Sequence, residues 1–406
     1  MPNCRMPIRR LFVGEGLWLG FMKYRSFGKL NWKVSALGFG AMRLPVIGHD
    51  AARINEPEAT KMIRYAVDHG VNYVDTAYPY HGGNSEALVG KALNDGYREK
   101  VKLATKMPTW LISSQQDMDK YLEEQLTRLK TDIDFYLLHG LTKERWQKLK
   151  TLDVANWAEK KIDEGKFKHL GFSFHDEYDV FKGIIDGYKD WALCQIQYNY
   201  ADADYQAGTR GLRYAASKGL AVVVMEPVAG GRLAIKPPKP IQDMWSEARV
   251  RRTQAEWALL WVWNHPEVSI ALSGMSTMQQ VKENVRTASH SGINRLTREE
   301  LSFVNQVALG YKKTGFIGCT GCRYCQPCPE GVNITEIISL YNEYYVENMS
   351  DAVKAKYWEH ITPESHAKRC ASCGKCEELC PQQLPIRDIL RRVAWIFEQE
   401  PPKPKK

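Results

Sequence analysis

The stretch "EPEATKMIRYAVDHGVNYVDTAYPY", residues 56–80, joins a helix pattern to a strand pattern. Apolar side chains recur at helical spacing through residue 70, and a short apolar run at 72–78 follows. This alternation of short apolar runs and amphipathic stretches extends from residue 34 to residue 289. Eight strands that are each followed by a helix are typical of a (β/α)8 TIM barrel, a fold of the α/β class. The predicted strands are 35–44, 72–78, 101–107, 134–140, 169–175, 193–199, 221–227 and 268–275.

An open doubly wound sheet is the alternative to a barrel, because both folds alternate strands and helices. No G-x-G-x-x-G follows the first strand, which disfavours a Rossmann nucleotide site. The length of 406 residues suits a barrel of roughly 250 residues plus an appendage. We therefore expect an unstructured extension at 1–21, the barrel at 22–292 and a mostly helical domain at 293–406.

The composition excludes several classes of protein. Hydrophobic residues make up 44% of the chain, which allows a large core, but no apolar run approaches the roughly 20 residues of a membrane helix. The formal net charge of +9 is spread along the chain, so we expect no nucleic-acid partner. Glu15 interrupts the apolar patch near the N-terminus, and no small-residue cleavage site follows, which indicates a cytoplasmic protein.

Eight of the ten cysteines lie in two short runs, "GCTGCRYCQPCP" at 318–329 and "CASCGKCEELCP" at 370–381. The second run has the C-x2-C-x2-C-x3-C-P spacing of bacterial ferredoxins, and the first is one residue shorter before its last cysteine. This pattern predicts two [4Fe–4S] clusters in a ferredoxin-like domain. In the usual crossed pairing, Cys319, Cys322, Cys325 and Cys380 hold one cluster, and Cys370, Cys373, Cys376 and Cys328 hold the other.

Other uses of these cysteines stay open. C-x2-C pairs also bind zinc, although triplets that end in Cys-Pro are not typical of zinc sites. Disulfides require an oxidising compartment, which the missing secretory signal argues against. The shorter spacing before Cys328 also allows an uncrossed arrangement, or one site that stays unfilled.

Four polar side chains follow the predicted strands where those strands end. Asp75 and Tyr80 come after the second strand, Lys106 after the third and His139 after the fourth. The carboxyl ends of barrel strands meet at one mouth, where catalytic groups of TIM barrels lie. We expect these four groups to converge there, although each one alone could have a structural role.

The chain resembles the aldo/keto reductases in motifs that all arrive in order at the expected strand ends. The matching motifs are "VDTAYPYHGGNSEALVGKAL" (74–93), "ATKM", "YLLHG", "EGKFKHLGFSFH", "CQIQYN", "EPVAGGRL" and "SGMSTMQQVKENV". The resemblance extends from about residue 23 to residue 287. The cysteine runs after the barrel are similar to a bacterial and archaeal branch of that family with a ferredoxin-like C-terminal domain.

The resemblance implies NAD(P)H-dependent interconversion of a carbonyl compound (an aldehyde, ketone or sugar) and an alcohol. Tyr80 would be the acid/base, because the alkoxide formed by hydride addition must be protonated. The ammonium of Lys106 would lower the pKa of Tyr80, and Asp75 would hold Lys106 in place. His139 would orient or polarise the substrate oxygen.

The resemblance also implies a site for the nicotinamide cofactor. Ser173 and Gln195 match the positions that bind the carboxamide, Arg232 could lie over the pyrophosphate, and the turn that opens the helix after the eighth strand could bind a phosphate. Usual basic residues are missing at Gly274 and Gln280, which leaves NADP and NAD both open. The expected cofactor residues are Ser173, Gln195, Arg232, Ser273, Gly274, Met275, Ser276, Gln280, Glu283 and Asn284.

The clusters raise a question of electron count. A nicotinamide transfers two electrons as a hydride, whereas a [4Fe–4S] cluster transfers one, so exchange between them needs a bound flavin or a redox partner such as a ferredoxin or flavoprotein. Two alternatives are an electron-carrying or redox-sensing protein with an idle barrel, and a reductase with purely structural clusters. Trp110, Trp146 and Trp245 are candidate walls for a sugar or ring substrate.

Overall fold

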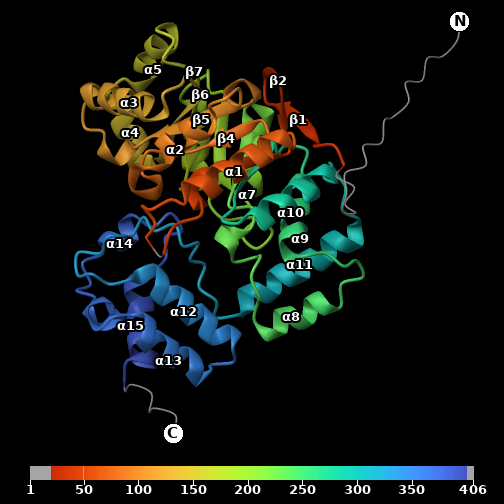
Figure 1. The fold of residues 1–406 in the computed structure, drawn as a ribbon, viewed down its shortest axis with the longest axis vertical. Helices are drawn as coiled ribbons and strands as arrows, with labels where there is room; N and C mark the ends of the chain where they lie inside the picture. Colours follow the sequence, from red (N-terminus) through yellow and green to blue (C-terminus); the bar gives the residue numbers. More distant parts are fainter. Residues whose placement is uncertain (1–19, 49, 400–406) are drawn as a thin grey trace, which may run out of the picture.

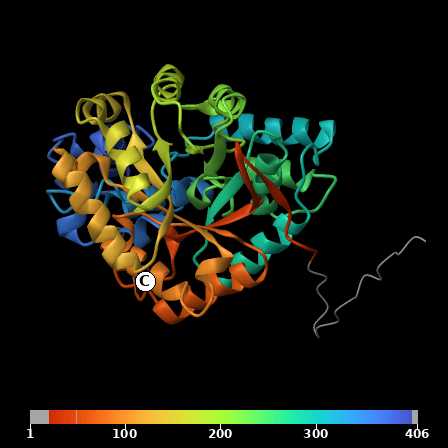
Figure 2. The ribbon, with the colours of Figure 1, turned by 90° about the horizontal axis from the view of Figure 1, so that it is seen from above.

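Eight parallel strands close into a barrel in the computed structural model, which describes residues 20–48 and 50–399. The strand order around the barrel is β10-β3-β4-β5-β6-β7-β8-β9. Figures 1 and 2 show the chain from two directions, with helices around the strands. All eight predicted strands are found, so the TIM-barrel prediction is confirmed and the open sheet is excluded. The strands are β3 Leu37–Gly40, β4 Tyr73–Asp75, β5 Lys102–Met107, β6 Ile133–Leu141, β7 Phe167–Phe174, β8 Leu193–Gln197, β9 Ala221–Met225 and β10 Ile270–Gly274.

Helices cover the outside of the barrel and bury their apolar faces against the strands. Helix α3 is representative: Met118, Leu122 and Leu129 are buried along one face, and Ser114 and Asp117 form a capping box at its start. The barrel helices are α1 Glu56–Asp68, α2 Ser85–Ala92, α3 Gln115–Leu129, α4 Lys143–Thr151, α5 Val154–Asp163, α6 Tyr178–Asp186, α7 Gly208–Ser217, α8 Lys239–Ser246, α9 Gln254–Trp263 and α10 Met278–Ser289.

A hairpin that the sequence analysis did not predict covers the amino end of the barrel. Strands β1 (Tyr24–Phe27) and β2 (Leu30–Ser35) pair antiparallel, and Phe27 packs against Tyr73 and Phe135 of the barrel interior. This hairpin leaves the carboxyl end as the mouth. The predicted extension at 1–21 lies outside the described residues apart from its last two.

The C-terminal domain is helical and has a core of its own, built from apolar residues between Val332 and Phe397. The chain from residue 334 to residue 360 forms two helices that are separated at Asn348 and Met349, which both have positive φ. The helices of this domain are α12 Ile334–Val346, α13 Asp351–His360, α14 Lys375–Glu378 and α15 Ile386–Phe397.

Helix α11 (Arg298–Lys313) begins with a capping box of Thr297 and Glu300. Its buried residues Val304 and Val307 belong to the core of the barrel. The domain boundary at residue 292 stays a prediction, and by its packing α11 lies with the barrel.

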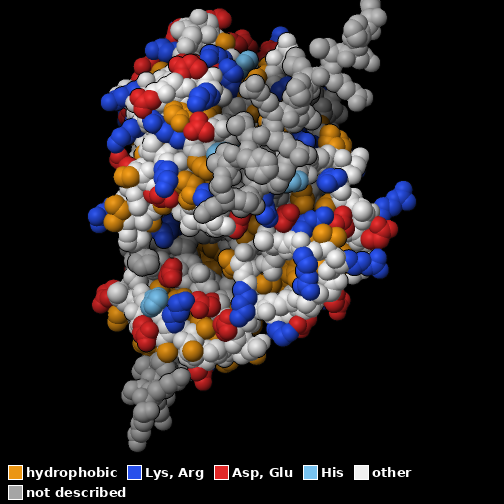
Figure 3. Space-filling view, turned by 45° about the vertical axis from the view of Figure 1, so that its right-hand side comes forward, with side chains coloured by type: hydrophobic (Ala, Val, Ile, Leu, Met, Phe, Trp, Pro, Cys, Tyr) orange, Lys and Arg blue, Asp and Glu red, His pale blue; other side chains and the backbone are white. Residues whose placement is uncertain are grey.

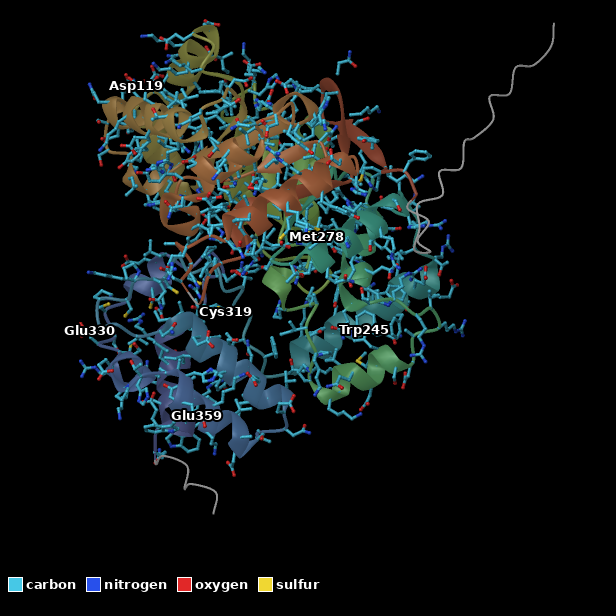
Figure 4. The ribbon with its side chains drawn as sticks, viewed as in Figure 1. Asp119, Trp245, Met278, Cys319, Glu330 and Glu359 are labelled. Carbon is cyan, nitrogen blue, oxygen red and sulfur yellow. The ribbon has the colours of Figure 1, made fainter. Side chains whose placement is uncertain are left out.

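The cysteine domain lies against the carboxyl mouth of the barrel (Figure 1, blue). Cys319 lies where the two parts meet, and Glu330 lies toward the outer side of the domain (Figure 4). On the face drawn in Figure 3, basic and acidic side chains are interspersed. Within the described ranges, no helix is both long enough and apolar enough to cross a membrane.

Candidate active site

The four polar groups predicted at the strand ends come together at the mouth of the barrel. Lys106 Nζ lies 2.5 Å from Asp75 Oδ1 and donates to the carbonyl oxygen of Thr76 at 2.7 Å. The same nitrogen is 3.5 Å from the Tyr80 hydroxyl. The rings of Tyr80 and His139 meet edge to face, with centroids 6.0 Å apart. All four side chains are buried, so their interactions act in a poorly solvated environment.

Burial sets the pKa values of this group. Burial raises the pKa of Asp75 and lowers that of Lys106, while the attraction between the two opposes both shifts. Burial also holds the pKa of His139 well below its usual range, with the Lys106 charge adding to this, so the imidazole is neutral near pH 7.

The expected lowering of the Tyr80 pKa by Lys106 is not what the structure gives. Burial raises the pKa of Tyr80 well above 10, and Tyr324 and Asp75 add to the rise. The physical reason is that the Lys106 charge is already neutralised by Asp75 at 2.5 Å, so it offers Tyr80 little net attraction. Tyr80 therefore keeps its proton at neutral pH.

Two predicted cofactor residues line the mouth on adjacent strands. Ser173 Oγ accepts a hydrogen bond from the Gly140 N–H at 2.7 Å, which leaves its own hydroxyl proton free to donate. Gln195 Nε2 lies 3.8 Å from the sulfur of Met225, and Gln195 Oε1 is buried without a hydrogen-bond partner among the described residues. An unpartnered buried amide oxygen costs free energy unless a ligand completes it, so Gln195 fits a carboxamide.

The remaining cofactor positions lie around the start of α10. Ser276 N–H donates to Gln280 Oε1 at 2.7 Å, so the helix start already satisfies this amide by itself. Asn284 Nδ2 donates to Ser273 Oγ at 3.1 Å, and Glu283 accepts from Gln279. Gly274 is exposed at the end of β10 and Met275 is buried. The turn leads into a helix, and one of its backbone N–H groups is already hydrogen-bonded within the protein; phosphate binding there stays a prediction.

Arg232 is not free for a pyrophosphate in this structure. Its guanidinium donates to Asp202 Oδ2 at 2.7 Å, and its side chain is only 11% exposed. Of the three tryptophans expected as substrate walls, Trp110 lies at the mouth, with its ring centroid 5.2 Å from that of His139. Trp146 is buried and packs against Trp191, and the half-buried Trp245 packs against Trp257.

The eight cysteines of the two runs surround two cavities in the crossed arrangement. The inner cavity, about 20 Å³, is lined by Cys319, Cys322, Cys325 and Cys380. The outer cavity, about 230 Å³, is lined by Cys370, Cys373, Cys376 and Cys328, with Cys325 at its edge.

The donor set fits clusters of iron and sulfide better than a single ion. In the described part of the chain, no group of three or more His, Cys, Asp or Glu side chains is arranged to hold one metal ion, and the cysteines form no disulfide. Burial raises the pKa of Cys322 to about 12, so metal binding at the inner site must release protons.

The sequence comparisons match this architecture part by part. Residues 36–307 match the Aldo/keto reductase family, and residues 318–384 match the 4Fe-4S dicluster domain. The chain belongs to the aldo/keto reductase family. It is an oxidoreductase of that family with a C-terminal 4Fe–4S domain, as the sequence analysis expected.

Known aldo/keto reductases and related proteins align with about 70% of this chain. L-galactose dehydrogenase from Arabidopsis thaliana is 28% identical over 309 residues, which span 70% of this chain and 94% of that protein. The structure of aldo-keto reductase AKR11C1 from Bacillus halodurans in its holo form is 28% identical with a TM-score of 0.59, covering 70% of this chain and 96% of that one. An aldo-keto reductase from Klebsiella pneumoniae in complex with NADPH is 25% identical with a TM-score of 0.55, covering 71% and 95%.

Sequence reasoning missed one residue of this aldo/keto reductase site. Tyr324 stands between Cys322 and Cys325 and reaches into the barrel mouth, where its hydroxyl lies 3.1 Å from His139 Nε2. Its ring centroid is 6.3 Å from that of Trp110. An aromatic residue inside a cysteine triplet was the available signal, but its position follows only from how the two domains dock.

Two further residues that the sequence analysis did not single out hold the cysteine domain on the mouth. Gln382, two residues after Cys380, donates to Gln197 Oε1 at 2.8 Å and to Glu226 Oε2 at 3.0 Å. Burial raises the pKa of Glu226 to about 7.

The backbones of the two domains also approach closely at Gly230. A Cβ at Gly230 would lie 2.5 Å from the carbonyl oxygen of Thr320, and the φ of Gly230 is +67°. Only glycine fits this contact. Arg43, at the end of a short turn after β3, donates to the same carbonyl oxygen.

Proposed function

We propose that this protein is an NAD(P)H-dependent oxidoreductase that interconverts a carbonyl compound and an alcohol at the barrel mouth. The observation that carries the proposal is the convergence of Asp75, Lys106, Tyr80 and His139 at the strand ends. A buried phenol that keeps its proton, beside a neutral imidazole, can donate that proton and bind the substrate oxygen.

Each side chain then has one task in the reduction of a carbonyl. A bound nicotinamide would supply the hydride to the carbonyl carbon. Tyr80 gives its hydroxyl proton to the oxygen that becomes an alcohol. Lys106 Nζ lies 3.5 Å from the Tyr80 hydroxyl and can donate a hydrogen bond to the oxygen that loses the proton. His139 Nε2 hydrogen-bonds the same oxygen and fixes its direction. The oxidation of an alcohol runs through the same groups in reverse.

Gln195 and Ser173 support a nicotinamide at this place. The free Oε1 of Gln195 would accept from the amide of the carboxamide, and the Ser173 hydroxyl would donate to its carbonyl. The relative from Klebsiella pneumoniae is described with NADPH, which supports NADP as the cofactor here. L-galactose dehydrogenase among the relatives supports a sugar or another small alcohol as substrate.

We also propose that the cysteine domain holds two [4Fe–4S] clusters that carry single electrons. The outer site includes the exposed Cys373, and the inner site lies against the barrel mouth. This order would let a ferredoxin or flavoprotein deliver electrons to the outer site, with a bound flavin as the alternative intermediary. A cytoplasmic location suits these oxidisable thiols.

The test uses the iron-loaded full-length protein under anaerobic conditions. NADPH and NADH oxidation at 340 nm are followed with a panel of aldehydes, ketones and sugars. We expect carbonyl-dependent oxidation of one of the two cofactors, with one alcohol formed for each cofactor consumed. Cofactor binding without turnover of any carbonyl or alcohol would favour an electron-carrying protein with an idle barrel.

A further inference from the structure

A tyrosine of the cysteine domain occupies the centre of the barrel's site. Tyr324 is half-buried between the loop of the first cysteine run and the strand ends. Its hydroxyl lies 3.1 Å from His139 Nε2, and its ring lies beside Trp110. Tyr324 also lies close to Tyr80, since it contributes to the raised pKa of the Tyr80 hydroxyl.

The Tyr324 hydroxyl has the chemistry of the substrate's reacting group. It is an alcohol-like oxygen that can both donate and accept, as the product alcohol does. The proposed reaction requires an oxygen that contacts His139 Nε2 and Tyr80 together. His139 Nε2 has a single bonding direction, so it binds either the Tyr324 hydroxyl or a substrate oxygen, and not both.

We propose that Tyr324 is a resident occupant of the substrate-oxygen position, and that substrate binds by displacing it. The proposal rests on the proposed function, in which Tyr80 and His139 bind the reacting oxygen. Tyr324 is then a specificity-determining residue, because only a substrate that binds these two groups better than a tethered phenol can enter.

The position of Tyr324 in the chain links this site to the inner cysteine site. The nearest cysteines before and after it in the chain, Cys322 and Cys325, both line the inner cavity. Movement of Tyr324 out of the mouth must therefore disturb the two cysteines that flank it. Binding of a substrate in the barrel should therefore alter the inner cysteine site. By thermodynamic linkage, a change at the inner cysteine site should in turn alter the affinity of the barrel for substrate.

The loop that carries Tyr324 is built so that it can move as a unit. Residues 315–323 form no helix or strand, and Gly321 and Arg323 have positive φ. The loop is attached to the barrel at Thr320, whose carbonyl accepts from Arg43, and to α12 through Ile317 and Asn342. Tyr324 extends from the far side of these two attachments.

Kinetics with benzaldehyde and NADPH test the displacement directly. Tyr324→Phe keeps the ring and removes the hydroxyl, so the KM for benzaldehyde should fall roughly 3- to 10-fold, the factor that corresponds to one net hydrogen bond. Tyr324→Ala should lower KM further. Tyr205→Phe is the matched control, because Tyr205 bonds Gln382 at the same interface without facing His139. An unchanged or raised KM in Tyr324→Phe would overturn the proposal.

A second readout does not depend on turnover. The visible circular dichroism of the oxidised, iron-loaded protein is recorded while benzaldehyde is added without NADPH. We expect a saturable change in wild type and Tyr205→Phe, and a change at least threefold smaller in Tyr324→Ala, where there is no tyrosine to displace. No spectral change in wild type at benzaldehyde concentrations above its KM would overturn the displacement proposal. The proposed function is tested separately, because it requires that Tyr80→Phe loses turnover.

Discussion

The barrel and the cysteine domain build the two sides of one mouth in different ways. On the barrel side, Asp75, Lys106 and His139 belong to hydrogen-bonded parallel strands that are buried on both faces. On the other side, Tyr324 and Gln382 lie on loops next to cysteines. The barrel groups therefore hold their geometry without metal, whereas the groups opposite them depend on how the thiols are held.

Removal of iron should have the largest effect, because it should unfold the cysteine domain while the barrel stays folded. The cysteine domain has a small core, so bound metal should supply much of its folding free energy, on the order of 10 kcal/mol. Calorimetry of the iron-free protein should show the barrel transition preserved and the cysteine-domain transition lost. Loss of both transitions together would mean that the two regions are not independent.

The two cysteine sites can be distinguished by removing one cysteine ligand from each in turn. We expect the iron-loaded protein to hold about eight iron atoms, and Cys380→Ala or Cys328→Ala about four each. Only Cys380→Ala should change the KM for a carbonyl substrate, because Cys380 belongs to the site beside the mouth. Equal kinetic effects of both variants, measured beside their iron and sulfide contents, would argue against the inner and outer assignment.

Tyr80→Phe tests the barrel side. Loss of the only proposed proton donor should lower turnover at least about 100-fold with little change in stability. Tyr78→Phe is the matched control, since its hydroxyl bonds Glu124 and not the site. Steady-state rates within a few-fold of wild type for Tyr80→Phe would remove Tyr80 from the mechanism.

Substitution of Glu226 should have the smallest effect. It should change how the stability of the contact between the barrel and the cysteine domain depends on pH. Folding raises the pKa of Glu226 from 4.5 to about 7, so the folded protein favours the protonated carboxyl. The stability of the fold is therefore highest below pH 4.5 and falls as the pH rises from 4.5 through about 7. Glu226→Gln mimics the protonated side chain and should gain about 2–3 kcal/mol over wild type above pH 8.

Melting temperatures of the iron-loaded protein at pH 5.5 and pH 8.5 measure this difference. The variant should melt a few degrees higher than wild type at pH 8.5, and the difference should be less than half as large at pH 5.5. A gain of the same size at both pH values would show that the titration of Glu226 is not its cause.

The sequence predicted the barrel because strand and helix periods recur eight times, and it placed Asp75, Tyr80, Lys106 and His139 because strand ends share one mouth. It did not predict the β1–β2 hairpin, whose short strands include no long apolar run. It also could not predict the electrostatics of Tyr80, which depend on burial by another domain.

The positions of Tyr324 and Gln382 could not be predicted from sequence patterns. The cysteine spacing indicates which thiols share a cluster, but the direction in which the loops between them point is set by docking. Tyr324 is 185 residues from His139 in the chain. No local period relates two residues at that separation.

Hydrogen–deuterium exchange tests most directly whether both regions form one mouth. Exchange is compared in iron-loaded and iron-free full-length protein, at the mouth segments 198–206 and 226–232 and at the hairpin 24–35 on the opposite end. If the cysteine domain covers the mouth, iron removal should accelerate exchange at both mouth segments and leave the hairpin unchanged. Mouth segments that exchange at the same rate with and without iron would contradict it.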